Sequence, residues 1–155
     1  MSAIFDPTGT YRYTLWRGWS DAPRLAFVLL NPSTADGLYN DPTIRRCMRL
    51  AQGWGFGSVE VVNLFAYRSP HPKMLTQVPD PVGPENDRYL LAAVKQAEQV
   101  IVAWGNWGCL FERDRTVLRL LAGRSPLFCL GNNRSGQPRH PLYVRREVAI
   151  VPFER

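Results

Sequence analysis

Four short apolar runs, separated by segments that suit helices or loops, constrain the fold more than any other feature of this sequence. They span residues 25–30 (LAFVLL), 59–64 (VEVVNL), 100–104 (VIVAW) and 127–130 (LFCL). All but the second are continuously apolar, as strands covered on both faces are, and each is too short for a buried helix. This rhythm predicts a three-layer α/β/α fold with a central, mainly parallel four-stranded sheet.

The segments between the runs carry helix signals. Asp41 can cap a helix that starts at Pro42 and extends to about Trp54, where glycines follow. In residues 84–99, apolar side chains recur at the spacing of one helical face. Residues 112–121 have a similar amphipathic pattern and are followed by a glycine. We therefore expect three helices to connect the predicted strands.

A chain of 155 residues has the size of one domain, so we expect a single α/β domain over residues 1–155. Residues 10–19 (TYRYTLWRGW) alternate in part and are expected to add an N-terminal edge hairpin or strand. Residues 69–84 contain five prolines and are expected to form one long surface loop. Because the apolar runs are short and the start lacks a signal-peptide pattern, we expect a cytoplasmic protein with no membrane contact.

Charge and cysteine content narrow the function classes only in part. A net charge of +6 and a pI near 9.7 favour a polyanionic partner, although many domains that bind nothing anionic are equally basic. The three cysteines are widely spaced and form neither a disulfide framework nor a CxxC metal site. The motifs GxGxxG, GxxxxGK[ST], HExxH and GxSxG are missing from the sequence. We therefore expect no metal and no cofactor.

Ligands of open parallel sheets bind outside the carboxyl ends of the strands, which directs attention to the loops after the apolar runs. The first such loop, residues 31–41 (NPSTADGLYND), is rich in small polar side chains. The amide of Asn31 can hold a water or a base edge, and Ser33 and Asp36 can add hydrogen bonds. Tyr39 can supply a stacking face. The same residues also favour a plain turn, so both interpretations stay open.

The second and third loops are candidates on weaker grounds. Asn63 stands near the end of a buried strand, where its amide must find a partner in a ligand or in a neighbouring loop. Arg68, shortly after it, can meet a phosphate, as any exposed arginine can. The glycines of residues 105–108 (GNWG) permit close backbone approach to a ligand, or simply make a turn.

The fourth loop combines Asn132, Asn133 and His140. A histidine has an intrinsic pKa near neutrality, so His140 can donate a hydrogen bond to developing negative charge or move a proton. A lone histidine in a loop is also often merely solvated. The two asparagines extend the polar surface that a ligand could contact.

Several motifs resemble a bacterial family that is catalogued as a domain of unknown function, DUF1643. The resemblance runs through nearly the whole chain: LLNPSTAD at residues 29–36, DPTIRRC at 41–47, VVNLFAYRSP at 61–70, AWG at 103–105 and HPLY at 140–143. This likeness implies a family and no activity.

More distantly, the order of these loops is similar to that of the uracil-DNA glycosylase superfamily, especially its mismatch-specific branch. Asn31-Pro32 matches the first-strand loop that positions the attacking water, and Asn63-Leu64 matches the segment that helps bind the base. His140, with the proline after it, matches the late loop that stabilises the departing base and grips the DNA. The resemblance therefore implies an α/β enzyme of DNA repair.

The residue roles follow from the same resemblance. Asn31 would hold the water, His140 would stabilise the anionic base, Asn63 would read the base, and Tyr39 or Phe65 would stack on it. The sequence departs from the pattern in two places. Ser33 stands where the mismatch-specific branch usually has glycine after Asn-Pro, and residues 142–143 (LY) replace the Ser-Pro of the His-Pro-Ser-Pro loop. The four cysteines of the iron–sulfur branches are missing, so no cluster is expected.

The sequence supports two main functional hypotheses. The first is a base-excising enzyme that acts on nucleic acid, a nucleoside or a nucleotide. The second is a non-catalytic module that binds a nucleotide or nucleic acid with the same residues. An unrelated small-molecule activity is a third alternative. These hypotheses differ in the roles of Asn31 and His140, and the sequence indicates no oligomeric state.

Overall fold

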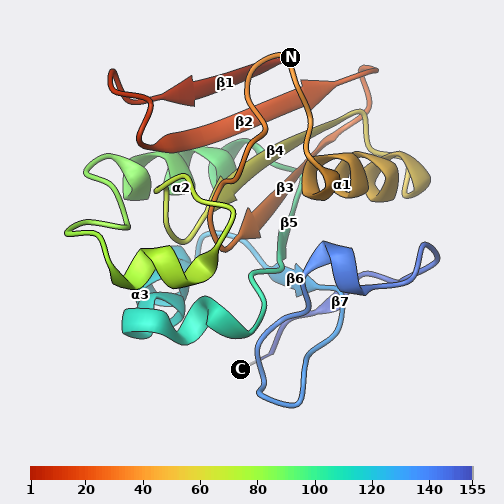
Figure 1. The fold of residues 1–155 in the computed structure, drawn as a ribbon. Coiled ribbons are helices and arrows are strands. Elements are labelled where there is room, and N and C mark those ends of the chain that lie inside the picture. The colour runs from red at the N-terminus through yellow and green to blue at the C-terminus, as the bar shows by residue number, and fades with distance from the viewer. Residues whose placement is uncertain (155) are drawn as a thin grey trace.

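The computed structural model describes residues 1–154, which form one seven-stranded mixed sheet with three α-helices and three short 3₁₀ helices (Figure 1). The strands are β1 (Ser2–Phe5), β2 (Arg12–Gly18), β3 (Arg24–Leu29), β4 (Ser58–Asn63), β5 (Gln99–Val102), β6 (Leu127–Cys129) and β7 (Val151–Pro152). The helices are α1 (Pro42–Gly53), η1 (Pro72–Thr76), α2 (Asn86–Gln96), η2 (Asn106–Glu112), α3 (Arg113–Leu121) and η3 (Pro141–Tyr143).

The sheet is larger than the sequence predicted. Its order is β1-β2-β4-β3-β5-β6-β7, and the four predicted strands, β4, β3, β5 and β6, form its parallel centre. The expectation of a four-stranded sheet was wrong because antiparallel strands extend both edges. β7 has two residues, too few to show a hydrophobic period, and joins through the backbone: Phe153 N–H donates to Leu127 O at 2.9 Å.

The N-terminal segment expected to add a hairpin or strand forms β2, and β1, which precedes that segment, completes a hairpin with it. β1 pairs antiparallel with β2, and β2 pairs antiparallel with β4 at the edge of the parallel centre. In Figure 1 this hairpin lies along the top of the molecule, far from β6 and β7. The edge strand β1 is short, which limits the open hydrogen-bonding edge that it presents.

The helices begin and end close to their predicted limits, with one correction. The carboxylate of Asp41 caps α1 by accepting a hydrogen bond from Ile44 N–H at 2.9 Å, as the sequence predicted. α2 ends earlier than expected, because Ala97 is already extended and Gln99 begins β5. Gln99 pairs with Leu25 of β3, so this last residue of the predicted helix belongs to the sheet instead.

Two apolar cores lie on opposite faces of the sheet. α1 covers one face with Ile44, Cys47, Leu50 and Ala51. α2 and α3 cover the other face, on which Leu90, Ala93, Val94, Val117 and Leu121 are buried. Each large apolar side chain that is fully buried contributes about 1.5–3 kcal/mol through removal from water. The three layers therefore hold the strand ends, and the loops after them, in fixed positions (Figure 1).

The segment of residues 69–84 differs in part from the predicted surface loop. It contains η1, and Leu75 from this short helix is fully buried in the core on the α2 side. Leu75 thus anchors the segment against the sheet. Within residues 1–154, the structure contains no helix of the length and apolarity that crossing a bilayer requires.

Candidate functional site

A cleft of about 470 Å³ lies at the carboxyl ends of the parallel strands. Its walls come from the loops after β3, β4, β5 and β6, and from the first residues of α1. In the sheet, β3 stands between β4 and β5, and the chain passes from β3 to β4 through α1 but from β4 to β5 through α2 on the opposite face. Such a switch of direction is where open α/β sheets bind ligands.

A second cavity of about 30 Å³ adjoins this cleft and has five of its lining residues in common with it, among them Asn31, Ser33 and His140. Arg12 and Asn63 line only the smaller cavity. A water needs about 10–15 Å³ of such space, together with two or more polar partners. The smaller cavity therefore has room for one or two waters, or for one polar atom of a ligand.

Asn31 is held in a defined orientation. Its Nδ2 donates to three backbone carbonyls, those of Pro32 at 3.1 Å, Tyr67 at 3.3 Å and Ser69 at 2.9 Å. The carbonyl of Pro32 also accepts Ser69 N–H at 2.8 Å, which joins the β3 loop to the β4 loop. Because carbonyl groups surround the amide nitrogen, Oδ1 is the atom of Asn31 that can accept a hydrogen bond from a ligand or water.

Asn63, at the end of β4, is almost fully buried, and within residues 1–154 neither atom of its amide has a hydrogen-bond partner. Its backbone is firmly held, since Asn86 Nδ2 donates to Asn63 O at 2.9 Å. A buried polar group without a partner costs about 1–3 kcal/mol. Asn63 lines the smaller cavity, in which a water or a ligand atom can remove that cost once the side chain turns toward it.

His140 lines both cavities and is a neutral hydrogen-bond donor. Its Nδ1 accepts Leu142 N–H at 3.2 Å, so the proton of the neutral ring is on Nε2. Burial lowers the pKa of His140 to about 4, and the nearby charge of Asp41 opposes that shift only in part. At neutral pH the ring is therefore uncharged and can donate through Nε2.

A buried cation lies beside the same small cavity. Arg12 is almost fully buried, its Nη1 donates to Ala35 O at 3.2 Å, and its Nε has no hydrogen-bond partner in the part of the chain that the structure describes. Burial lowers the pKa of Arg12 to about 10, against the opposing charge of Asp41, so it stays protonated at neutral pH. Positive charge at this depth favours a ligand that carries or develops negative charge.

Asp41 joins several parts of the site. Besides capping α1, its carboxylate accepts Ala35 N–H at 3.2 Å through Oδ2, and the residue lines both cavities. Both carboxylate oxygens are therefore engaged with backbone N–H groups. This arrangement ties the loop after β3 to the first turn of α1.

Other residues predicted for the site lie outside the cleft. Asp36 Oδ1 accepts the N–H groups of Leu38 and Tyr39, both at 2.8 Å, and these bonds lower the pKa of Asp36 while closing a turn. The ring of Tyr39 is largely exposed and lies apart from both cavities. Phe65 is fully buried in the core on the α2 side, so the stacking face expected there is not accessible. Trp107, with a partly exposed ring, and Tyr143, with a largely exposed one, line the cleft instead.

Arg68 lines an adjoining hollow of about 530 Å³, which has Ser33 and Ser69 in common with the cleft. Its Nη1 donates to Gly9 O at 3.2 Å, and its guanidinium lies 4.7 Å from the centre of the Phe5 ring. The residue is therefore near the cleft but held by the N-terminal hairpin.

The two asparagines of the fourth loop do not line the cleft. Asn133 Nδ2 donates to Asn106 Oδ1 at 3.0 Å and so supports a residue that lines the cleft. Asn132 is exposed and lies outside the cavities. Among residues 1 to 154, no three His, Cys, Asp or Glu side chains lie close enough together to hold a metal ion.

Sequence reasoning missed Arg12, Trp107 and Tyr143. Arg12 stands among tyrosines in a strand, and its local sequence does not distinguish it from an exposed strand arginine. Trp107 lies in the glycine-containing loop of residues 105–108, and its aromatic ring is the sequence signal that could identify it.

The family model described as "Protein of unknown function (DUF1643)" matches residues 12–142. The chain belongs to this family. The matched region contains Arg12, Asn31, Asn63 and His140, so the DUF1643 assignment covers the smaller cavity completely and the cleft except for Tyr143. Neither the curated proteins nor the solved structures contain a match to the chain.

Proposed function

We propose that this DUF1643 protein binds the base of a nucleotide or nucleic acid in the cleft and hydrolyses its N-glycosidic bond. The observation that carries the proposal is that Asn31, Asn63 and His140, from three different loops and strand ends, line one small polar cavity beside a larger cleft. The uracil-DNA glycosylase resemblance of the same three positions supports the choice of reaction.

The reaction needs a water on the sugar side and stabilisation of the leaving base. The water oxygen bonds to C1′, the C1′–N bond breaks, its electron pair leaves with the base nitrogen, and the proton lost by the water ends on the base. Asn31 Oδ1 would accept a hydrogen bond from the water, since its Nδ2 is already held by carbonyls. The water is thus oriented before the bond breaks.

The leaving base would receive its stabilisation from the inner end of the cleft. In the proposal a polar edge of the base enters the smaller cavity, where the Asn63 amide offers both a donor and an acceptor. The neutral His140 ring donates through Nε2 to the anion that forms, and the buried charge of Arg12 lowers its energy. The rings of Trp107 and Tyr143 offer faces for the base.

The test is to incubate the pure protein with single-stranded and duplex oligonucleotides carrying uracil, a mismatch or a damaged base, and with free nucleosides and nucleotides. Abasic sites are detected by alkaline strand cleavage, and the freed base by chromatography. We expect base release from at least one substrate. Asn31→Ala and His140→Ala should each lower the rate about 10²- to 10³-fold, the usual effect of losing one such polar contact.

Matched controls are available for both variants. Asn132→Ala and His71→Ala change the same residue types at exposed positions outside the cavities and should leave the rate unchanged. If Asn31→Ala and His140→Ala released base as fast as these controls, the residue assignment would be wrong.

A second candidate is a non-catalytic module that binds a nucleotide or nucleic acid. The buried amide of Asn63 and the Nε of Arg12, which have no partner within the described residues, can be satisfied by a bound polar ligand without any reaction. Retained binding with no base release from any substrate would favour this function over hydrolysis.

A further inference from the structure

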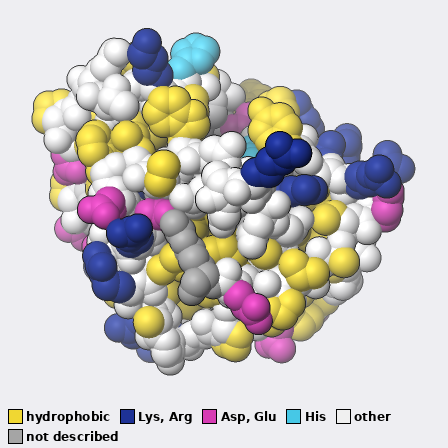
Figure 2. Space-filling model, turned by 90° about the horizontal axis from the view of Figure 1, so that it is seen from below, with side chains coloured by type: hydrophobic (Ala, Val, Ile, Leu, Met, Phe, Trp, Pro, Cys, Tyr) yellow, Lys and Arg dark blue, Asp and Glu magenta, His cyan; other side chains and the backbone are white. Residues whose placement is uncertain are grey.

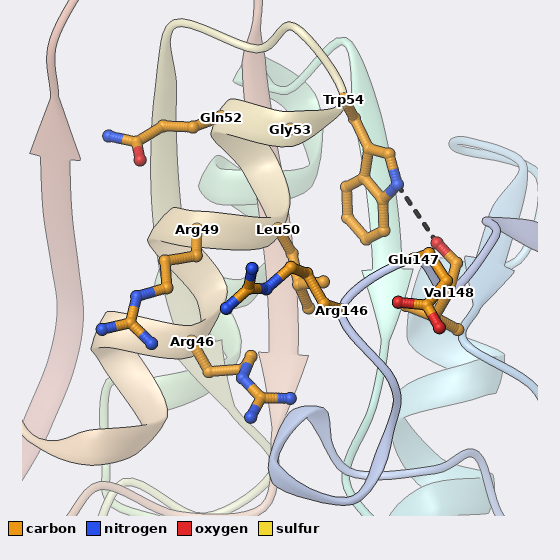
Figure 3. A pocket seen from close by; sticks show the side chains of 9 residues that line it. All are labelled: Arg46, Arg49, Leu50, Gln52, Gly53, Trp54, Arg146, Glu147 and Val148. Carbon is orange, nitrogen blue, oxygen red and sulfur yellow. Dashed lines mark hydrogen bonds between the residues drawn. The ribbon is translucent and has the colours of Figure 1, made fainter.

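A separate hollow of about 460 Å³ lies on the flank of α1, against residues 146–148 (Figure 3). Three arginines line it, Arg46 and Arg49 from α1 and Arg146 from the C-terminal segment. Figure 3 shows their guanidinium groups gathered on one side, with the Trp54 indole and the Glu147 carboxylate on the other. We call this hollow the arginine pocket.

The positive charges of the arginine pocket exceed the negative charge in its lining, among the residues that the structure describes. Arg49 and Arg146 are exposed, and within residues 1–154 neither takes part in an ion pair. Glu147 is the acidic residue in the lining, against three positive side chains. Like charges held together repel one another, and an anion bound among them would relieve that repulsion.

The three arginines of the arginine pocket form a local group. Figure 2, which looks at the molecule from below Figure 1, shows Lys and Arg side chains scattered around the edge of that face, with hydrophobic and neutral side chains between them. The net charge of +6 therefore does not form one continuous basic face in this view. The arginine pocket combines three guanidinium groups with a hollow and an aromatic ring, which scattered surface charge does not.

The arginine pocket is linked to the candidate site by Arg46. Its Nη1 donates to Pro141 O at 3.3 Å and to Val144 O at 2.8 Å, in the segment that directly follows His140. α1 also joins the two places, since Thr43 in its first turn lines the cleft and Arg49 lines the arginine pocket. Six helical residues at about 1.5 Å each span roughly 9 Å.

A nucleic-acid strand can span that separation. Phosphates of one strand follow one another at about 3.4 Å along a helix axis, so about 9 Å corresponds to roughly three phosphates. Guanidinium groups bind phosphate oxygens in pairs of hydrogen bonds. The Trp54 ring is oriented by its Nε1–H, which donates to Val148 O at 3.3 Å, and offers a face to a base.

We infer that the arginine pocket binds phosphate groups of a nucleic-acid strand whose target base occupies the cleft. The second half of this statement rests on the proposed function, whereas phosphate binding in the arginine pocket does not. The inference selects nucleic acid, rather than a free nucleoside, as the substrate class. It also assigns Arg49 and Arg146 to binding of the strand.

The test measures binding of a short fluorescent single-stranded oligonucleotide by anisotropy over a series of salt concentrations. Each phosphate contact on a single strand contributes about 0.7 to the slope of log K against log salt. The double variant R49Q/R146Q should therefore bind more weakly, with a slope lower by about 1.4. R49K/R146K keeps the charges and should recover most of the slope.

The matched control is R119Q/R124Q, which removes the same two charges from exposed positions on and just after α3, across the sheet from α1. It should leave the slope nearly unchanged. An equal effect of both double variants, or no oligonucleotide binding by the unaltered protein, would overturn the inference. Competition by inorganic phosphate or a mononucleotide as effective as that by the oligonucleotide would overturn the choice of a strand.

The result of the salt-dependence test can be distinguished from the result of the base-release test. Failure of hydrolysis appears as no base release from any substrate, whereas failure of the inference appears as no difference between the two double variants. Asn31→Ala should lower base release and keep the salt slope of oligonucleotide binding, because Asn31 does not line the arginine pocket and the three arginines do not line the cleft.

Discussion

Two buried polar clusters near the cleft are built in opposite ways. In the first, Trp104 Nε1–H donates to Gln137 Oε1 at 2.8 Å, and Gln137 Nε2 donates to Asp114 Oδ2 at 3.0 Å. In the second, around the smaller cavity, the amide of Asn63 and the Nε of Arg12 have no hydrogen-bond partner among the described residues. The first cluster is satisfied by the chain itself, whereas the residues of the second line a cavity and have polar atoms without a partner among the described residues.

The satisfied cluster contributes to the stability of the fold, whereas the unsatisfied cluster is suited to binding a ligand. The Trp104–Gln137 hydrogen bond holds the residue after β5 against the segment that precedes His140. Both Trp104 and His140 line the cleft, so this bond helps to fix the position of its wall. Unpaired buried groups cost about 1–3 kcal/mol each, and folded proteins keep few of them. A water or a ligand in the cavity would supply the hydrogen bonds that these groups lack. We therefore expect the two clusters to respond differently to substitution.

The largest effect is expected in the satisfied cluster. Gln137→Ala removes the acceptor of Trp104 Nε1–H and the donor to Asp114, both of which are buried, and should lower the free energy of unfolding by about 3 kcal/mol. Urea unfolding followed by tryptophan fluorescence measures this change. Gln77→Ala, at an exposed glutamine, is the control and should change stability by less than about 0.5 kcal/mol. Equal values for the two variants would contradict the structural role of Gln137.

The next effect is a pH dependence that belongs to His140. Its pKa is about 4 in the folded chain, against an ordinary value of 6.5. Between these values the unfolded chain binds more protons, so stability falls as the pH is lowered from about 6.5 and the loss is complete below about 4. At about 1.4 kcal/mol per pH unit, this window corresponds to at most about 3.5 kcal/mol, which water around the partly exposed ring reduces.

The measurement is the free energy of unfolding at a series of pH values for the unaltered protein and for His140→Gln. The variant cannot titrate at this position, so the unaltered protein should lose stability relative to it within this window. His71→Gln should follow the unaltered protein. The lowered pKa of Asp36 acts only below its ordinary value of 3.8, outside the window. A constant difference between the unaltered protein and His140→Gln would show that His140 titrates normally.

The smallest effect on stability is expected in the unsatisfied cluster. Asn63→Leu replaces a buried amide that has no partner within residues 1–154 with an apolar side chain of similar size. Stability should stay the same or rise by up to about 1 kcal/mol, while base release is lost. Asn86→Leu is the contrast, because Asn86 Nδ2 donates to Asn63 O and Leu64 O, and its loss should cost about 1–3 kcal/mol. Equal destabilisation by both variants would mean that the Asn63 amide is satisfied in solution.

Much of the fold could be predicted from local sequence. The four apolar runs mark the parallel strands to within one or two residues, because strands buried on both faces must be apolar throughout. Asp41 and Pro42 mark the start of α1 because capping chemistry is local. β7 could not be predicted, since a two-residue edge strand depends on the backbone that it meets and not on its own side chains.

The site was only partly predictable for a similar reason. Asn31, Ser33 and His140 follow buried strands and do line the cleft. Phe65 and Tyr39 have the right chemistry for stacking, yet one ring faces the core and the other faces solvent. The direction of a side chain in a loop depends on turn geometry and on neighbouring loops, which residue type does not specify.

The sequence by itself determined the DUF1643 family, the central strands, the limits of α1 and the supply of polar residues after the strands. Only the tertiary structure decided that Asn31, Asn63 and His140 share one cavity, and that Arg12 lies buried beside them. These residues are far apart in the chain, and the order β4-β3-β5-β6 brings them together. That order results from packing helices on both faces of the sheet, which no local pattern of residues records.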